Sequence, residues 1–288
     1  MICCCRAVSC EAIFSFSALA SEFPTDTTNT TTTNGECAPK EVSFGPNTML
    51  LVPADLSDRG ACNQTLSYTP QVMITESGRN RIISSNSIPD HQVGLFGQRN
   101  GALNPNAIRE VSESYTIPLH PTLASSITYL WNNESGPEYE LGVLLNGVLL
   151  DPEAAEPFPH EGFFSSDVNL EWNLDAMIIN LGLDCNNAHV QPRGKYHHHG
   201  APTLSSSFSL KNGERPGDGV TAPCGTYNGV YTNDWEFINS QGDLDECNGR
   251  NGLTPEYPNG TYYYVITDAF PFLPRCLKGT PSTDFRLR

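Results

Sequence analysis

The sequence has few basic residues and no long apolar run. No apolar stretch reaches the roughly 18 residues that cross a bilayer, so we expect a soluble mature protein without a membrane span. Lysine and arginine number 16 against 32 aspartates and glutamates, which gives a net charge of −16. Nucleic-acid binding needs a basic face, so this balance argues against a nucleic-acid partner and against adsorption to anionic membranes. The same charge is compatible with attraction of cations, although acidity also simply keeps a secreted protein in solution.

Complete catalytic signatures are missing as well. The chain has no Gly-x-Ser-x-Gly elbow, no phosphate loop and no dinucleotide fingerprint. The cysteines from residue 37 onward include no Cys-x-x-Cys pair, which argues against a zinc ribbon and against a thioredoxin-like redox site. Ser-His-Asp catalysis and carboxylate-pair glycoside hydrolysis need no local signature, so an extracellular hydrolase stays open as one alternative.

The first 36 residues have the composition of an export signal followed by a spacer. Residues 1–20 contain one basic residue, Arg6, and an apolar run that ends in the small-x-small pattern Ala18-Leu19-Ala20. Consecutive cysteines near the start offer palmitoylation as a second interpretation. Residues 21–36 are rich in threonine and predict a disordered spacer. We therefore expect a secreted, extracellular protein with one ordered domain over residues 37–288.

The cysteines that remain after such a signal support export. Their number is even, which suits three disulfides in an oxidising compartment. They are Cys37, Cys62, Cys185, Cys224, Cys247 and Cys276. Closeness in sequence suggests the pair Cys37–Cys62, and the remaining connectivity is open. Glycosylation triplets that fit an exported glycoprotein begin at Asn29, Asn63, Asn133 and Asn259.

Composition and residue patterns predict a mainly β fold. Glycine and proline number 24 and 22, which favours many turns over long helices. Strand patterns lie at residues 69–75, 113–119 and 261–267. The last of them has the aromatic and β-branched enrichment of a buried strand. Residues 140–150 place apolar runs on both sides of Asn146-Gly147, the preferred type I′ turn pair, and predict a β-hairpin. Residues 173–181 keep helical spacing and predict a short helix or a turn. We expect a single disulfide-linked domain, β-sandwich-like or otherwise β-rich, with few short helices.

Consecutive histidines at residues 197–199 form the strongest candidate site. Alternate side chains of a strand share a face, so His197 and His199 would point together, with Tyr196 and His198 on the opposite face. Two convergent imidazoles make half of a site for zinc, copper or iron. Three histidines in a row also fit two simpler interpretations, a solvated pH-sensitive patch or core imidazoles bonded to the backbone.

Other residues complete the predicted site. His189 precedes a turn containing proline and glycine that would return the chain to the same face, and His91 is the other candidate for a third ligand. Asp90 and Asp184 are the carboxylates that would orient an imidazole, with Tyr196 as a further supporting residue. Copper or zinc suits such an imidazole site better than calcium.

An acidic cluster at residues 243–248 suggests calcium, because carboxylate oxygens gather there. Its spacing departs from the EF-hand loop, and Cys247 within it favours a stapled turn instead.

Several blocks of the chain resemble the YHYH-domain proteins. They are SNSIPDHQVG (85–94), NPNAI (104–108), GVLLDPEAAEPF (147–158), EWNLDA (171–176), LGLDCNNAHVQPRGKYHHHGAPT (181–203) and the run 242–276. The blocks keep the family's order and imply an exported protein, with no established activity to carry over. By this resemblance His197 and His199 are the family-like histidines, and His198 stands where the family has its second tyrosine. A segment that usually follows the block ending at Thr203 is missing here.

The leading hypothesis is therefore a secreted domain that binds a transition metal through its histidine strand. The rival from another class is a structural or adhesive surface glycoprotein without catalysis, whose partner would be a polysaccharide or another matrix component. The threonine-rich spacer, the glycosylation triplets and the acidity all suit that rival.

Overall fold

The computed structural model describes most of the chain from residue 59 onward and two short strands before it. The described ranges are residues 41–44, 47–50, 53, 59–160, 167–179, 181–200, 207–239, 241–242, 244–254 and 257–287. The predictions that fall outside these ranges concern the signal at 1–20, the spacer at 21–36, Cys37, the sequon at Asn29 and the junction after Thr203.

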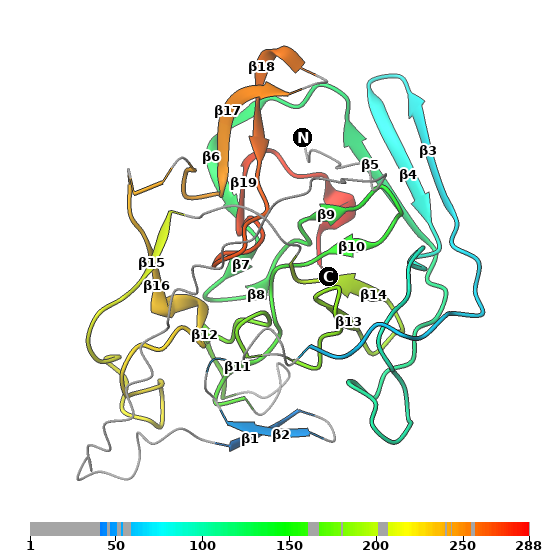
Figure 1. Cartoon of the computed structure of the whole chain (residues 1–288). Coiled ribbons are helices and arrows are strands. Elements are labelled where there is room, and N and C mark those ends of the chain that lie inside the picture. The colour runs from blue at the N-terminus through cyan, green and yellow to red at the C-terminus, as the bar shows by residue number, and fades with distance from the viewer. Residues whose placement is uncertain are drawn as a thin grey trace, which may run out of the picture.

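Short strands dominate the described chain, and the prediction of a mainly β fold is confirmed (Figure 1). The strands of the first half are β1 Glu41–Phe44, β2 Asn47–Leu50, β3 Val72–Ser77, β4 Asn80–Ser85, β5 Glu113–Pro118, β6 Leu123–Tyr129, β7 Trp131–Asn132, β8 Gly136–Pro137, β9 Gly142–Val143 and β10 Leu149–Leu150. Those of the second half are β11 Pro157–Phe158, β12 Asn169–Asn173, β13 Ala188–Val190, β14 Tyr196–His198, β15 Phe208–Leu210, β16 Trp235–Phe237, β17 Gly249–Thr254, β18 Tyr257–Tyr264 and β19 Cys276–Gly279. Two single-turn 3₁₀ helices, η2 Thr232–Asp234 and η3 Thr283–Phe285, accompany them.

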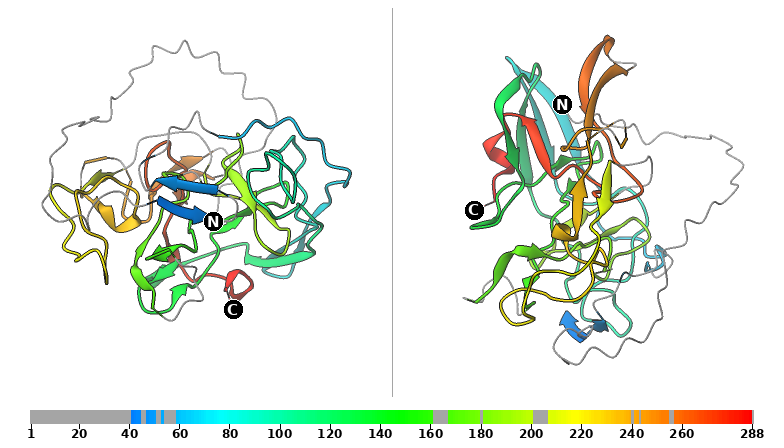
Figure 2. Two further views of the ribbon diagram at one scale, coloured as in Figure 1. Left: turned by 90° about the horizontal axis from the view of Figure 1, so that it is seen from below. Right: turned by 90° about the vertical axis from the view of Figure 1, so that its left-hand side faces the viewer.

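A four-stranded sheet in the order β13-β14-β10-β9 lies at the centre of the fold. Strand β10 runs parallel to β14 and antiparallel to β9, while β13 and β14 form an antiparallel hairpin. The sheet β3-β4-β5 flanks this centre, and β6 pairs with β19. Strands β17 and β18 form a hairpin that extends beyond its neighbours (Figures 1 and 2).

Apolar side chains cover both faces of the central sheet. One face packs in a cluster of Ile88, Val93, Phe96, Ile108, Val148, Ala188, Val190 and Tyr196. The other carries Ile83, Tyr115, Val143, Leu149 and Phe285. Burial on both faces explains why β9 and β10 lie in apolar runs rather than in alternating patterns.

The predicted hairpin at residues 140–150 is confirmed, but its turn type was wrong. Strands β9 and β10 pair antiparallel, and Leu144 closes the loop by donating its amide to Val148 O at 2.8 Å. A type I′ turn needs positive φ at both central residues, whereas here only Gly147 has it, at 82°. Asn146 instead uses its side chain, whose Oδ1 accepts from the Val148 amide at 3.1 Å. The loop therefore has three residues, a length that ends in a left-handed glycine.

The other predicted strands lie near their expected positions, but their ends and their burial differ from the prediction. Residues 113–119 contain β5, and residues 69–75 overlap β3. The strand expected at 261–267 is β18, which starts earlier and is half-buried rather than buried. It pairs with β17 alone among the described strands, so one edge lacks a covering neighbour. Within the predicted range 173–181, residues 176–179 form a turn, in which the Ile179 amide donates to Asp175 O at 3.1 Å.

Two disulfides are described, Cys62–Cys185 and Cys247–Cys276, and Cys224 is disulfide-bonded as well. The predicted pair Cys37–Cys62 was wrong. The Gly60 amide donates to Leu183 O at 3.0 Å, which aligns the two segments and brings Cys62 to Cys185 despite a separation of 123 residues. Closeness in sequence therefore did not decide this pairing.

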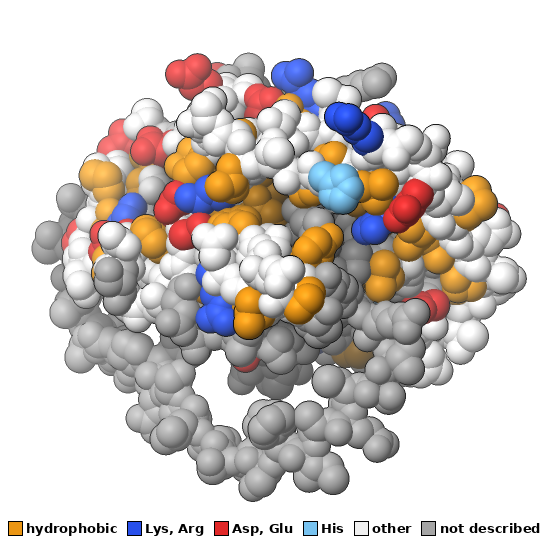
Figure 3. Space-filling view, turned by 90° about the horizontal axis from the view of Figure 1, so that it is seen from above, with side chains coloured by type: hydrophobic (Ala, Val, Ile, Leu, Met, Phe, Trp, Pro, Cys, Tyr) orange, Lys and Arg blue, Asp and Glu red, His pale blue; other side chains and the backbone are white. Residues whose placement is uncertain are grey.

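The surface mixes charge signs on the face that Figure 3 shows, where hydrophobic groups reach the solvent in separate patches between acidic and basic side chains. Among the helices of the described residues, none is long and apolar enough to cross a membrane.

Candidate metal centre

The hairpin of β13 and β14 brings three histidines to one face of the central sheet. Its register places His189 opposite His197, and His199 follows two residues later on the same face. The turn between the strands closes where the Gly194 amide donates to Gln191 O at 2.8 Å. Gly194 has φ 94°, and a Cβ there would meet the Arg109 side chain at 2.8 Å, so only glycine fits this turn. The predicted return of His189 to the face of His197 is what the structure shows.

The three imidazoles converge through their Nε2 atoms. His199 Nε2 lies 3.0 Å from His197 Nε2 and 3.1 Å from His189 Nε2. The ring centroids are 4.7, 4.8 and 4.7 Å apart, so the rings form a nearly equilateral group. One ligand atom from each residue falls within 4.8 Å of the others, and this triad could hold a metal ion.

Contacts with backbone carbonyls indicate which ring nitrogen carries the proton in two of the histidines. His189 Nδ1 lies 3.0 Å from Leu181 O and His197 Nδ1 lies 3.4 Å from Lys195 O. A carbonyl only accepts, so we place a proton on each Nδ1 and leave each Nε2 with a lone pair. His199 Nδ1 is buried and has no hydrogen-bond partner among the described residues. The network of these imidazoles is thus incomplete without a further donor, acceptor or ion.

Burial keeps all three imidazoles neutral, as ligation requires. Desolvation lowers the pKa of His197 and of His199 well below 6.5, and in each case a neighbouring imidazole of the triad lowers it further. Desolvation also lowers the pKa of His189, while the bond to Leu181 O and the charge of Asp184 act in the opposite direction. Neutral histidines with free lone pairs are the form that binds zinc and copper.

Two of the nitrogen separations are close to those expected around a bound ion. Zinc binds imidazole nitrogen at about 2.0–2.1 Å in tetrahedral geometry, which places two ligand atoms roughly 3.3 Å apart. The observed separations of 3.0 and 3.1 Å require a widening of a few tenths of an ångström. Three protein ligands leave one position open, the arrangement of catalytic rather than structural zinc sites.

The opposite face of the hairpin holds the other predicted residues. His91 packs against Tyr196 and His198 with centroid distances of 5.9 and 5.7 Å, so it lies apart from the triad. His198 Nδ1 bonds to Asn186 O at 2.8 Å. Asp90 is exposed and accepts from Asn146 Nδ2 at 2.9 Å. The third histidine of the triad is therefore His189 and not His91.

Asp184 supports the site indirectly, through hydrogen bonds from backbone amides and from the Tyr196 hydroxyl. Its carboxylate accepts from the Gly94 amide at 2.9 Å and from the Tyr196 hydroxyl at 2.8 Å. It also accepts from the amides of Asn186 and Ala188, at 2.9 and 3.3 Å. None of these donors is an imidazole of the triad, so Asp184 and Tyr196 together fix the hairpin that carries the histidines.

Charged residues around the triad were missed by the sequence reasoning. Lys195 lies two residues before His197 on the same strand face, where it pairs with Glu140 at 2.9 Å and Glu113 at 3.2 Å. Strand alternation alone could have placed Lys195 there. The charges of Arg275 and Arg59 also lower the pKa of His199, after burial and the other histidines. No local signal marked these two, because they come from distant parts of the chain.

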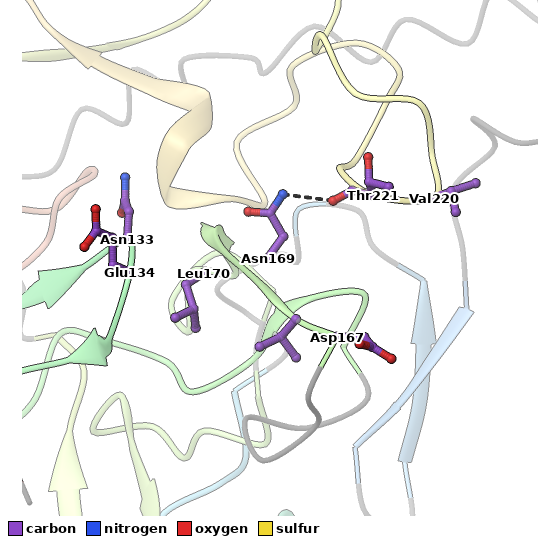
Figure 4. Close-up of a pocket in the computed structure, with 8 residues that line it drawn as sticks. Asn133, Glu134, Asp167, Asn169, Leu170, Val220 and Thr221 are labelled. Carbon is purple, nitrogen blue, oxygen red and sulfur yellow. Dashed lines mark hydrogen bonds between the residues drawn. The ribbon is translucent and has the colours of Figure 1, made fainter.

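A shallow polar cavity of about 510 Å³ lies elsewhere on the molecule. Figure 4 shows Asn133 and Glu134 at one side of it and Val220 and Thr221 at the other, with Asn169 donating to Thr221 O at 2.9 Å. None of its lining residues belongs to the triad, so the cavity is separate from the candidate metal centre.

The fold and the site together define a β-rich, disulfide-linked domain whose central hairpin carries three histidines, two of them buried and His189 half-buried. The family model described as "YHYH protein" matches residues 114–205 and 203–279, which together span more than half of the chain. The chain belongs to the YHYH protein family. The two matched segments overlap at residues 203–205. Comparison with curated proteins and with solved structures found no match to either.

Proposed function

We propose that this protein binds a copper or zinc ion through His189, His197 and His199. The observation that carries the proposal is the convergence of three Nε2 atoms from neutral imidazoles, two of them in buried residues and one in the half-buried His189, together with the unpartnered Nδ1 of His199. Imidazole nitrogen prefers copper and zinc, whereas calcium requires oxygen ligands. The proposal is one of binding, and the fourth coordination position is where water or a substrate would bind.

We also propose that the protein acts outside the cell as a glycoprotein. Disulfides such as Cys62–Cys185 form in oxidising compartments. The three described sequon residues, Asn63, Asn133 and Asn259, are all exposed, as glycan attachment requires.

Metal content of the secreted, untagged chain tests the first proposal. Elemental mass spectrometry after exposure to zinc or copper should give about one ion per chain in the wild type, and a large loss in His189→Ala, His197→Ala and His199→Ala. The matched control is His198→Tyr, which changes the adjacent histidine on the opposite face and should keep the ion. Unchanged metal in all three triad variants, or none in the wild type, would refute the proposal.

A further inference from the structure

Aromatic side chains from four parts of the chain line a pocket that the triad does not use. They are Tyr129, Trp131, Phe208, Trp235, Phe237 and Phe270. We refer to this cavity, of about 280 Å³, as the aromatic pocket. Its volume lies just below the usual range of roughly 300–1,000 Å³ for small-molecule sites, so the pocket suits a small ligand group.

Four of the six rings that line the aromatic pocket pack against one another. Trp235 stacks on Phe270 with centroids 4.9 Å apart and planes 5° from parallel. Phe208 packs edge-on against Phe270 and Phe237, at 5.4 and 5.6 Å. Tyr129 is 60 % exposed, so its ring is available to a ligand at the rim. Rigid aromatic faces that remain partly exposed provide stacking surfaces at low entropic cost.

A buried ion pair adds polar groups to this apolar lining. Arg275 Nη1 donates to Glu153 Oε2 at 3.1 Å, and Arg275 Nη2 donates to Asp175 Oδ2 at 2.6 Å. Glu153 is 8 % exposed, and its hydrogen bond from Arg275 uses only Oε2. Its other oxygen, Oε1, is not one of the fully buried polar atoms without a partner, so a ligand hydroxyl in the pocket can reach it and donate to it.

The charges of the pocket argue against a cationic ligand. Glu153 is paired with Arg275, and the other lining carboxylate, Glu246, is paired with Lys278. No unpaired carboxylate of the described lining is therefore left for a cation. Aromatic faces combined with neutralised hydrogen-bonding groups suit a ring with an apolar C–H face and hydroxyls at its edge.

We infer that the aromatic pocket binds sugar rings of a neutral glycan. The C–H faces of the sugar lie on Trp235 and Tyr129, and a hydroxyl donates to Glu153 Oε1. The proposal is independent of the metal centre, because no residue of the triad lines the pocket. Asn133, which begins a glycosylation triplet, lines both this pocket and the cavity of Figure 4, so any glycan attached there is removed before the test.

Titration of enzymatically deglycosylated full-length protein with neutral tetrasaccharides tests the proposal. The panel contains β-1,4-glucan, β-1,3-glucan, β-1,4-linked N-acetylglucosamine and mannan fragments. Choline is titrated beside them as a cationic comparison, and binding is followed by isothermal calorimetry. At least one should bind in the millimolar range or tighter. Tyr129→Ala should weaken that binding about tenfold, and Trp235→Ala more, with rescue by Trp235→Phe.

Tyr68→Ala is the matched control, because Tyr68 is 38 % exposed and does not line the pocket. Its affinity should equal that of the wild type, and chelation of metal should leave all affinities unchanged. Absence of binding to the whole panel would overturn the proposal, as would binding that survives Tyr129→Ala, or binding of choline in place of every sugar. Because Tyr129 lies at the rim of the pocket, we expect Tyr129→Ala to fold, so a loss of binding in this variant reports the lost contact.

Discussion

Replacing Asp151 by asparagine should flatten the dependence of stability on pH between about pH 6 and pH 9. Asp151 follows β10, where its amide donates to His198 O at 2.9 Å, and its side chain is buried. Burial raises the pKa of its carboxyl from 3.8 to about 8, and the neighbouring carboxylate of Glu140 contributes to the rise. At neutral pH the folded protein therefore keeps a proton that the unfolded chain has released.

The sign and size of the effect follow from that difference. Because the folded-state pKa is the higher one, the contribution of Asp151 to stability is fully present below about pH 4 and is lost as the pH rises to about 8. Each pH unit within this window corresponds to about 1.4 kcal/mol, so the loss between pH 6 and pH 9 is about 3 kcal/mol. Asp151→Asn keeps the shape of the protonated acid and does not titrate.

Urea unfolding followed by tryptophan fluorescence measures the effect at several pH values. The free energy of unfolding of the wild type, relative to Asp151→Asn, should fall by about 3 kcal/mol from pH 6 to pH 9. Asp218→Asn is the control, since backbone amides of Thr221 and Val220 hold the pKa of this exposed carboxyl far below that window. Parallel curves for wild type and Asp151→Asn would refute the reasoning.

Three further predictions concern the support of the histidine hairpin. Tyr196→Phe removes the hydroxyl that donates to Asp184 at 2.8 Å and should lower the free energy of unfolding by about 1–3 kcal/mol in urea titrations, with Tyr68→Phe unchanged. Asp184→Ala leaves buried amide donors without an acceptor and should cost more than Tyr196→Phe; an equal or smaller loss in thermal unfolding would contradict the assigned role. Replacing Cys62 and Cys185 by alanine opens a loop closed over 123 residues and should lower the free energy of unfolding by up to about 5 kcal/mol. The loss is measured as a shift of the urea midpoint, and an unchanged midpoint would mean that this disulfide does not constrain the unfolded chain.

Local periodicity was enough to predict the strand face of the metal centre. Strand alternation placed His197 and His199 together and His198 opposite, and this is the arrangement in the structure. The return of His189 also followed from local sequence, because the turn that reverses the chain lies between the two strands. The choice between His189 and His91 stayed open, since His91 approaches the hairpin through tertiary packing.

Long-range features were beyond sequence reasoning for the same physical reason. The disulfide of Cys62 with Cys185 depends on two segments that meet only in the folded chain. Arg275 reaches the neighbourhood of His199 by pairing with Glu153 and Asp175, residues more than 90 positions away. The turn at Asn146-Gly147 is not the predicted type I′ turn, because Asn146 does not adopt a positive φ and its side chain instead bonds to Val148 and Asp90.

Titration of the untagged protein with zinc and copper, before and after triad substitution, tests the central claim most directly. We expect one ion per wild-type chain, held at pH 6 because burial lowers the pKa of His197 and His199, and released only on stronger acidification. His198→Tyr should behave as the wild type, and His199→Ala should not retain the ion. Equal retention in His199→Ala and His198→Tyr, or no ion in the wild type, would contradict the assignment of the triad as a metal centre.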